Sequence, residues 1–173
     1  CRFCQKVLEN EVLNLGNQPP SNAYLSKECL KKCEATYPLK VFVCEECWLV
    51  QIPEHSKPEE LFTENYAYLS STSTSWCNHA ENYVKKSIKK LNLDSQSNIV
   101  EIASNDGYLL QYFLKKNYQC LGIEPTKVCA DASIAKRINT IQEFFGTKLA
   151  KILLSKGNEL EKGADLVIAN NVL

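Results

Sequence analysis

Short apolar runs alternate with amphipathic stretches throughout the last third of the chain. Runs of four to six residues with the composition of buried strands lie at 98–102, 119–124, 139–142 and 165–170. Between them, apolar residues recur at the spacing of helices over 108–116, 127–136 and 146–155. Strand–helix alternation at this pace predicts an α/β domain over 96–173, built on a parallel sheet with right-handed crossovers.

The middle of the chain has the pattern of one amphipathic helix. Ser and Thr crowd positions 70–75, where their side chains suit a helix N-cap. Apolar residues then recur every three or four positions, at Trp76, Ala80, Val84, Ile88 and Leu91. We therefore read 59–95 as a helical connecting segment whose apolar stripe lies on the following domain.

The first 58 residues contain few large apolar side chains but six of the nine cysteines. Cys1 and Cys4 form one C-x-x-C pair, and Cys44 and Cys47 form another. Two such pairs complete a tetrahedral shell of four thiolates, which leaves no open position, so the ion would be structural. We predict a small zinc-binding domain over 1–58, with a strand at 37–43 leading into the second pair.

Cys29 and Cys33 lie between the two C-x-x-C pairs, in a C-x-x-x-C arrangement among lysines. The better interpretation is a pair of free thiols at helical spacing, and the alternative is that they form a second site or serve as alternate ligands. Gly16, Pro19 and Pro20 interrupt the stretch before them.

Composition and charge exclude several functional classes. Hydrophobic residues make up 45% and charged residues 23%, and 20 basic residues balance 20 acidic ones. This balance disfavours nucleic acid as a partner. No apolar run is long enough to span a membrane, and the start of the chain lacks the pattern of a signal peptide. We expect a cytoplasmic protein. Because the chain has no Met and begins at Cys, residues are also expected to precede it.

The segment EIASNDG, residues 101–107, follows the first predicted strand of the α/β domain. Ligands of parallel sheets bind beyond the carboxyl ends of the strands, where this segment lies. Of the glycines in the dinucleotide fingerprint G-x-G-x-x-G only Gly107 is present, which argues against a nicotinamide-dependent reductase. The polar side chains of Ser104, Asn105 and Asp106 suit the amino-acid tail of a ligand better than a pyrophosphate.

Other candidate ligand-binding residues follow the neighbouring strands. Glu124 ends the second strand, 17 residues after Gly107, where an acid can accept hydrogen bonds from a ribose diol. Phe144 follows the third strand, where either an adenine contact or core packing accounts for it. Asn170 and Asn171 follow the fourth strand. Together these positions predict an adenosine-type ligand.

Tyr66, Tyr68 and His79 have two readings. They are packed aromatic residues and a surface His, or they line the mouth of a pocket, and the sequence favours neither reading for the tyrosines. For His79 the surface reading is the better one.

Several blocks of the chain, in order, resemble those of a known family. They are CRFC, LGNQPPSNAYL, YPLKVFVCEECWLVQ, LFTENYAYLSSTS, EIASNDGYLL, GIEP and ADLVIANNVL. This series resembles the sugar C-methyltransferases that act on nucleotide-linked keto-deoxysugars and carry an N-terminal zinc-binding domain. They are class I S-adenosylmethionine-dependent methyltransferases with a Rossmann-like sheet. Ala103 and Asn105 depart from the general E/D-x-G-x-G-x-G pattern of that class but match the narrower group.

The resemblance implies two cofactors and a set of site residues. Zn²⁺ would be held by the four cysteines of the C-x-x-C pairs. S-adenosyl-L-methionine would be bound by Ser70, Glu101, Ala103, Ser104, Asn105, Gly107, Leu109, Glu124, Pro125, Phe144 and Asn170. The catalytic candidates within this chain are Tyr66, Tyr68 and His79.

The resemblance also implies a reaction and a longer protein. A base removes a proton from the carbon beside the sugar's ketone, and the resulting enolate attacks the sulfonium methyl. Family members continue beyond the fourth strand with the expected base, the rest of the sheet and a C-terminal domain. We therefore expect an incomplete sheet, and a chain that is inactive alone.

Two alternatives remain. The enzyme could methylate an oxygen of a sugar or another small molecule. The chain could instead be a non-catalytic zinc-ribbon interaction module that binds no cofactor. The oligomeric state is left open.

Overall fold

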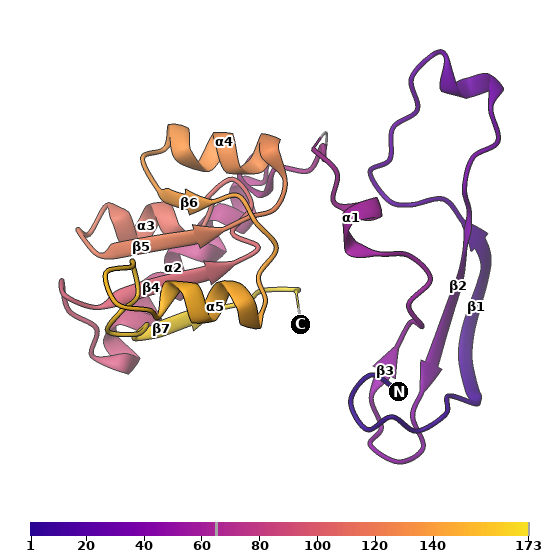
Figure 1. The fold of residues 1–173 in the computed structure, drawn as a ribbon, viewed down its shortest axis with the longest axis horizontal. Helices are drawn as coiled ribbons and strands as arrows, with labels where there is room; N and C mark the ends of the chain where they lie inside the picture. Colours follow the sequence, from indigo (N-terminus) through magenta and orange to yellow (C-terminus); the bar gives the residue numbers. More distant parts are fainter. Residues whose placement is uncertain (65, 173) are drawn as a thin grey trace. The chain divides into compact units, whose positions relative to one another are not determined.

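The computed structural model describes residues 1–64 and 66–172, which form two compact units, Cys1–Phe62 and Thr63–Leu173 (Figure 1). We call them unit 1 and unit 2. The sequence pattern placed the first boundary at residue 58 and treated 59–95 as a connector. In the structure residues 63–95 belong to unit 2, because their helix packs on its sheet.

Unit 1 is a three-stranded antiparallel sheet of order β1-β2-β3. The strands are β1 (Asn10–Gln18), β2 (Tyr37–Val43) and β3 (Val50–Gln51), with the short turn η1 (Cys29–Lys31) and helix α1 (Pro58–Leu61) beside them. The strand at 37–43 is confirmed. Strand β1 was not predicted, because it is an irregular edge strand with two register shifts.

Unit 1 has almost no apolar core. Among its described residues, the buried side chains are Cys44 and Gln51. Large apolar side chains are exposed instead, including Phe3 at 78% and Trp48 at 73%. A sheet of this size with so little buried surface needs another source of stability.

Unit 2 contains the predicted parallel sheet. Its strands are β4 (Asn98–Ile102), β5 (Gln119–Ile123), β6 (Asn139–Ile141) and β7 (Leu166–Ile168), in the order β6-β5-β4-β7. All three pairings are parallel. The α/β fold class is therefore confirmed, and the carboxyl ends of the four strands lie at one edge of the sheet.

Four helices and one short turn accompany this sheet: α2 (Thr74–Leu91), α3 (Leu110–Leu114), α4 (Lys127–Ala135), α5 (Thr147–Leu153) and η2 (Ser70–Thr72). Helix α2 begins where the hydroxyl of Ser73 accepts a hydrogen bond of 3.2 Å from the amide of Trp76. It ends at Asn92, which has a φ of 52°. Helix α3 is shorter than predicted, because residues 105–109 form turns before it.

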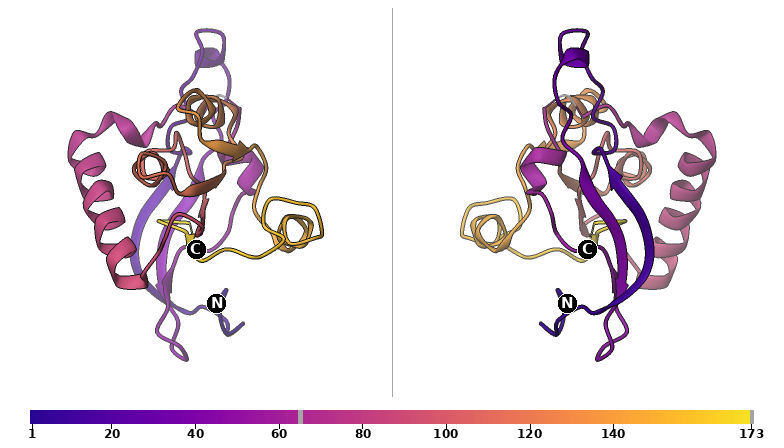
Figure 2. Two further views of the ribbon diagram at one scale, coloured as in Figure 1. Left: turned by 90° about the vertical axis from the view of Figure 1, so that its left-hand side faces the viewer. Right: turned by 90° about the vertical axis from the view of Figure 1, so that its right-hand side faces the viewer.

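Helices cover both faces of the sheet (Figure 2). On one face, α2 and α3 bury Ala80, Val84, Leu110 and Phe113 against Ile99. On the other, α5 buries Leu149 and Leu153 against a second group of apolar strand residues, Val100, Leu121 and Ile123. The alternation of Ile99 and Val100 between the two clusters follows from the two-residue period of a strand.

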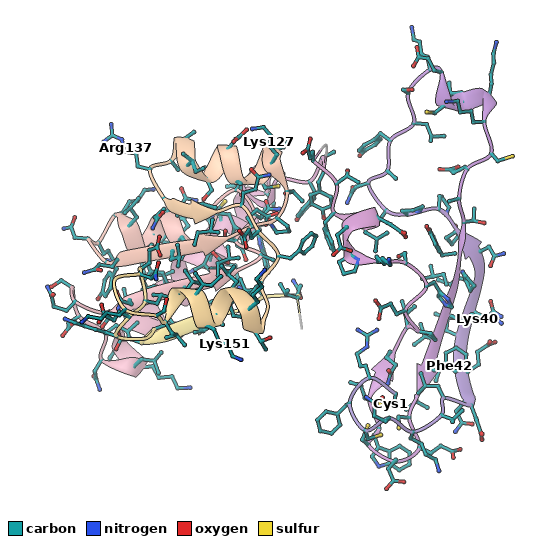
Figure 3. All side chains as sticks on the ribbon, in the orientation of Figure 1. Cys1, Lys40, Phe42, Lys127, Arg137 and Lys151 are labelled. Carbon is teal, nitrogen blue, oxygen red and sulfur yellow. The ribbon has the colours of Figure 1, made fainter. Side chains whose placement is uncertain are left out.

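Basic side chains are dispersed over unit 2. Lys127, Arg137 and Lys151 point outward from α4, from the turn after it and from α5 (Figure 3). Lys127 forms an ion pair of 2.7 Å with Asp131. No helix in the described part of the chain is both long and apolar enough to cross a membrane.

Candidate functional site

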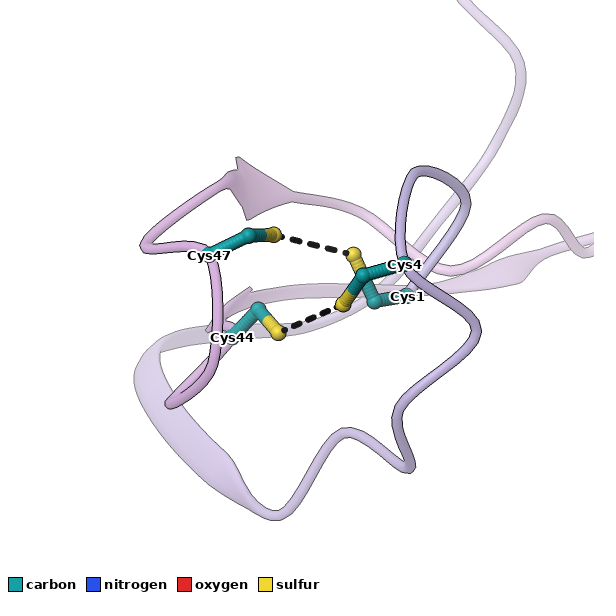
Figure 4. A group of neighbouring side chains, drawn as sticks. All are labelled: Cys1, Cys4, Cys44 and Cys47. Carbon is teal, nitrogen blue, oxygen red and sulfur yellow. Dashed lines mark hydrogen bonds between the residues drawn. The ribbon is translucent and has the colours of Figure 1, made fainter.

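The four cysteines predicted as zinc ligands come together in unit 1. Their sulfur atoms all lie within 4.8 Å of one another, with Cys1–Cys47 at 3.6 Å and Cys4–Cys44 at 3.5 Å (Figure 4). Tetrahedral zinc with Zn–S bonds of about 2.3 Å places its sulfurs roughly 3.8 Å apart. The cluster therefore fits a structural Zn²⁺ ion bound by four thiolates.

Both C-x-x-C pairs have the same local geometry. The amide of Gln5 donates to the carbonyl of Cys1 at 2.9 Å, and the amide of Trp48 donates to that of Cys44 at 2.9 Å. Gln5 and Trp48 have φ values of 64° and 61°. A tight turn thus closes each pair and directs its two sulfur atoms toward the same group.

Thiolates, not thiols, bind zinc. Hydrogen bonding from the backbone of Cys47 lowers the pKa of Cys44 to about 7, although burial acts in the opposite direction. Cys29 and Cys33 do not belong to this group of ligands. Cys29 is half-buried in η1 and Cys33 is exposed.

Gln51 supports the cluster from outside. Its amide nitrogen donates to the sulfur of Cys1 at 3.2 Å, and its oxygen accepts from the amide of Arg2 at 2.9 Å. We expect Gln51→Ala to lower zinc affinity by about tenfold to a hundredfold, because it removes a partner that orients a ligand. Competition with a chromogenic chelator measures this. Gln18→Ala, on the exposed strand β1, is the control, and an equal loss in both variants would contradict the role of Gln51.

Residues 103–107 form a tight loop at the carboxyl end of β4. Ala103, Asn105 and Gly107 all have left-handed backbones, with φ of 52°, 50° and 73°. These are the alternate positions where the general E/D-x-G-x-G-x-G pattern has glycine. The loop therefore keeps the backbone shape of that pattern although two of its three glycines are replaced.

The side chains of Asn105 and Asp106 hold the preceding segment of unit 2. Asn105 accepts a hydrogen bond of 2.8 Å from the amide of Ser70 and donates one of 3.0 Å to the carbonyl of Tyr68. Asp106 accepts from the amide and hydroxyl of Ser71. Residues 68–71 are thus brought to the loop, and these two side chains bond protein groups.

Lys136 completes the environment of Asp106. Its amino group lies 3.0 Å from the carboxylate and 2.6 Å from the backbone carbonyl of the same residue. No sequence pattern indicated Lys136, nor Cys129, whose sulfur lies 3.4 Å from the side-chain amide nitrogen of Asn105. Neither residue stands in a motif, so only the folded chain brings them to the loop.

Glu124 is buried at the carboxyl end of β5, with 4% of its surface exposed. One carboxylate oxygen accepts from the amide and hydroxyl of Thr126 at 2.9 and 2.6 Å, and the other accepts from the amide of Asn105 at 2.9 Å. A carboxylate has about four acceptor sites, so one remains for a ligand. Glu124 can accept a second hydrogen bond from a ligand only when the Thr126 hydroxyl rotates away from the carboxylate.

Two buried polar atoms beside this loop have no partner among the described residues. They are one carboxylate oxygen of Glu101, the Oε2, and the hydroxyl of Ser104. Glu101 is 1% exposed and Ser104 is fully buried. Buried polar atoms without partners are rare, and a bound ligand is one explanation for them.

Tyr108 connects Glu101 to a small hollow. Its hydroxyl accepts a hydrogen bond of 3.4 Å from the side chain of Asn170, and hydrogen bonding from Tyr108 acts to lower the pKa of Glu101. Burial raises the pKa of Tyr108 to about 12, so the hydroxyl remains a donor. The hollow, of about 100 Å³, is lined by Trp76, His79, Ala80, Tyr83, Tyr108, Leu109, Asn170 and Asn171.

The remaining predicted site residues lie in varied environments. His79 is exposed on α2 and stacks on Trp76 at a ring distance of 5.2 Å. Tyr66 is half-buried, and Tyr68 is 47% exposed. Pro125 is half-buried after Glu124, and Phe144 is 40% exposed after β6.

Two larger hollows, of about 470 and 370 Å³, lie at the opposite edge of the sheet. Asp94, Ser97 and Asp165 are among the lining residues of the first, and Asn98 and Gln119 line the second. Ligands of parallel sheets bind at the carboxyl edge, and both unpartnered buried atoms lie there. The loop edge is therefore the candidate site, although its hollow is smaller.

Two comparisons with known proteins gave matches, one to the N-terminal unit and one to most of the chain. Residues 1–62 match the family Methyltransf_13, described as "Putative zinc binding domain". The chain is also 26% identical over 156 residues to the C-methyltransferase NovU of Streptomyces niveus. That alignment covers 90% of this chain and 37% of the relative, so the chain spans little more than a third of its length. Residues 1–62 thus match a zinc-binding domain family, and most of the chain is similar to a C-methyltransferase.

Proposed function

We propose that this chain is the zinc-binding and cofactor-binding part of a methyltransferase that takes its methyl group from S-adenosyl-L-methionine. The observation that carries the proposal is the loop after β4. It folds between Glu124 and the segment 68–71, and it leaves two buried polar atoms, on Glu101 and Ser104, without a protein partner among the described residues. The amino-acid tail of the cofactor supplies hydrogen-bonding groups of the kind that these atoms lack.

Other residues at this edge suit the rest of the cofactor. Glu124 retains an acceptor site for a ribose hydroxyl. Phe144, 40% exposed after β6, suits an adenine ring. The cofactor supplies an electrophilic methyl group when bound. These residues hold the cofactor and orient it at the carboxyl edge of the sheet.

We propose a nucleotide-linked keto-deoxysugar as the substrate and one of its carbons as the methyl acceptor. The ketone of such a sugar acidifies the neighbouring C–H group, so a base can form the carbon nucleophile. The similarity to a protein named as a C-methyltransferase favours carbon over oxygen. Tyr68, in the segment held by the loop, and Tyr66, just before that segment, stay candidates for the substrate side. His79, stacked on Trp76 at the surface of α2, is the weaker candidate.

We also propose that the protein works in the reducing environment of the cytoplasm. All nine cysteines are free, and a zinc site of four thiolates requires reduced sulfur.

Calorimetric titration with S-adenosylhomocysteine, the demethylated cofactor, tests the proposal. We expect the zinc-loaded chain to bind it saturably and not to bind NAD. Glu124→Gln should weaken binding by about tenfold to a hundredfold, because a charge-assisted hydrogen bond contributes about 1.5–3 kcal/mol.

Glu81→Gln is the matched control, since Glu81 forms a surface ion pair with Lys85 on α2. It should leave the affinity unchanged. A folded chain that binds no S-adenosylhomocysteine would overturn the proposal in favour of the zinc-ribbon interaction module.

A further inference from the structure

Three carboxyl groups are buried around the loop after β4. Glu101 and Asp106 are each 1% exposed, and Glu124 is 4% exposed. A buried carboxylate is stable only when hydrogen bonds or cations compensate its charge. The three groups differ in how many such partners the protein supplies.

Two of the three are compensated by protein groups. Asp106 forms an ion pair of 3.0 Å with Lys136 and accepts hydrogen bonds from Ser71. Glu124 accepts hydrogen bonds from two backbone amides and one hydroxyl. Both carboxyl groups therefore have hydrogen-bond donors supplied by the protein.

Glu101 has no comparable compensation among the described residues. Its Oε2 has no hydrogen-bond partner there. Burial raises the pKa of Glu101 well above its usual range; the Tyr108 hydrogen bond opposes this, and the charges of Asp106 and Glu124 add to it.

The groups that face Glu101 offer no cation in the described part of the chain. Tyr108 stands before α3, Asp106 lies in the loop, and Cys120 and Glu124 come from β5. From the side of β7, Tyr108 meets the neutral amide of Asn170. From α2, Trp76 stacks on Tyr108, with His79 on its outer side. Lys136, the nearby cation, is already paired with Asp106.

We propose that Glu101 holds a proton in the free protein and releases it when the ammonium group of an amino-acid ligand binds beside its unpartnered oxygen. Tyr108 is a positioning residue that donates to the carboxylate once it is ionised. This inference rests on the proposed function and adds to it: binding of the cofactor is linked to proton release. Binding therefore strengthens as pH rises toward the pKa of Glu101 in the free protein.

The proton balance determines the sign of this effect. The ammonium of the ligand is already charged at pH 6.5, and an ordinary Glu with a pKa of about 4.3 is already ionised there. A proton that leaves on binding at pH 6.5 must therefore come from a group that was held protonated. In the free protein that group is Glu101.

Calorimetry of S-adenosylhomocysteine binding at pH 6.5, in buffers with different ionisation enthalpies, counts the protons released. We expect about one proton per ligand. Methylthioadenosine is the control ligand, since it keeps the adenosine and the sulfur but lacks the amino-acid tail that carries the ammonium. It should release none, and equal release by both ligands would overturn the role of the ammonium.

Two variants test the residues. Glu101→Gln keeps the shape of the protonated acid, so we expect it to abolish proton release and to weaken S-adenosylhomocysteine binding by about tenfold or more. Tyr108→Phe removes one donor to the carboxylate, so the pH profile of binding should move to higher pH. Unchanged proton release in Glu101→Gln would overturn the inference.

Carbon-detected NMR of glutamate carboxyl groups in the free chain gives a readout that needs no ligand. The signal of Glu101, assigned by its loss in Glu101→Gln, should keep the shift of a protonated acid at pH 6.5. Titration near pH 4.3 would overturn the inference. So would binding of S-adenosylhomocysteine without buffer dependence, although the proposed function would then stand. Absence of binding by the folded chain overturns both.

Discussion

Removal of zinc is expected to unfold unit 1 and to leave unit 2 folded. Among its described residues unit 1 buries Cys44 and Gln51, and both belong to the metal site or contact it. Structural zinc binding contributes about 10–16 kcal/mol in small zinc domains, which equals or exceeds the usual stability of a whole domain. Unit 2 has two apolar clusters that do not involve the metal.

Cys44→Ser provides a test at a single residue, with hydrogen exchange as the measurement. The amides of β1, β2 and β3 should lose protection in the variant or after treatment with a chelator. The amides of β4 and β5 should keep theirs. One zinc ion per chain is expected before treatment.

Cys33→Ser is the control, because Cys33 is exposed and lies outside the group of four ligands. It should retain both the zinc and the protection of unit 1. If the Cys44 variant kept a protected sheet without metal, the assignment of zinc as the main source of stability in unit 1 would be wrong.

Gly107→Ala is expected to destabilise unit 2 by about 2–5 kcal/mol. The residue has a φ of +73°, which costs an alanine about 1–2 kcal/mol. A Cβ would also lie 2.3 Å from Cδ1 of Ile138 and 2.9 Å from Oγ of Ser133. Both neighbours are buried, so their displacement adds about 1–3 kcal/mol of overpacking. Chemical denaturation followed by the signals of unit 2 measures the loss.

Alanine substitutions at two other glycines separate the backbone cost from the steric cost. Gly157 has a φ of +83° but nothing within 4 Å of the position that a methyl group would take, so Gly157→Ala should show the backbone cost alone. Gly146 has an extended backbone, with φ of −168°, and open space, so Gly146→Ala should be close to neutral. Equal losses at 107 and 157 would contradict the steric argument.

Prediction from the sequence worked where the signal is local. Strand β4 was predicted at its observed bounds, because a central parallel strand buries both faces and reads as an apolar run. Strand β2 was also predicted correctly. The edge strand β1 was missed, because its exposed face and Gly16 make it resemble a loop.

The candidate site was likewise predicted where its signal is local. The spacing of the cysteines by itself predicted the group of four that the structure brings together, because each C-x-x-C pair forms its own turn. The loop 101–107 and Glu124 were identified because both follow strands of the sheet. Their detailed roles could not be read in this way.

Only the tertiary structure decided which of these side chains bond other protein groups and which keep an atom without a partner among the described residues. Asn105 and Asp106 were expected to meet an amino-acid tail, yet they bond residues 68–71, about 35 positions earlier. Lys136, 30 positions after Asp106, pairs with that acid. Glu101 was left with an oxygen that has no partner among the described residues. Each outcome depends on distant segments meeting at one sheet edge, and the charge of a buried acid depends on the partners found there.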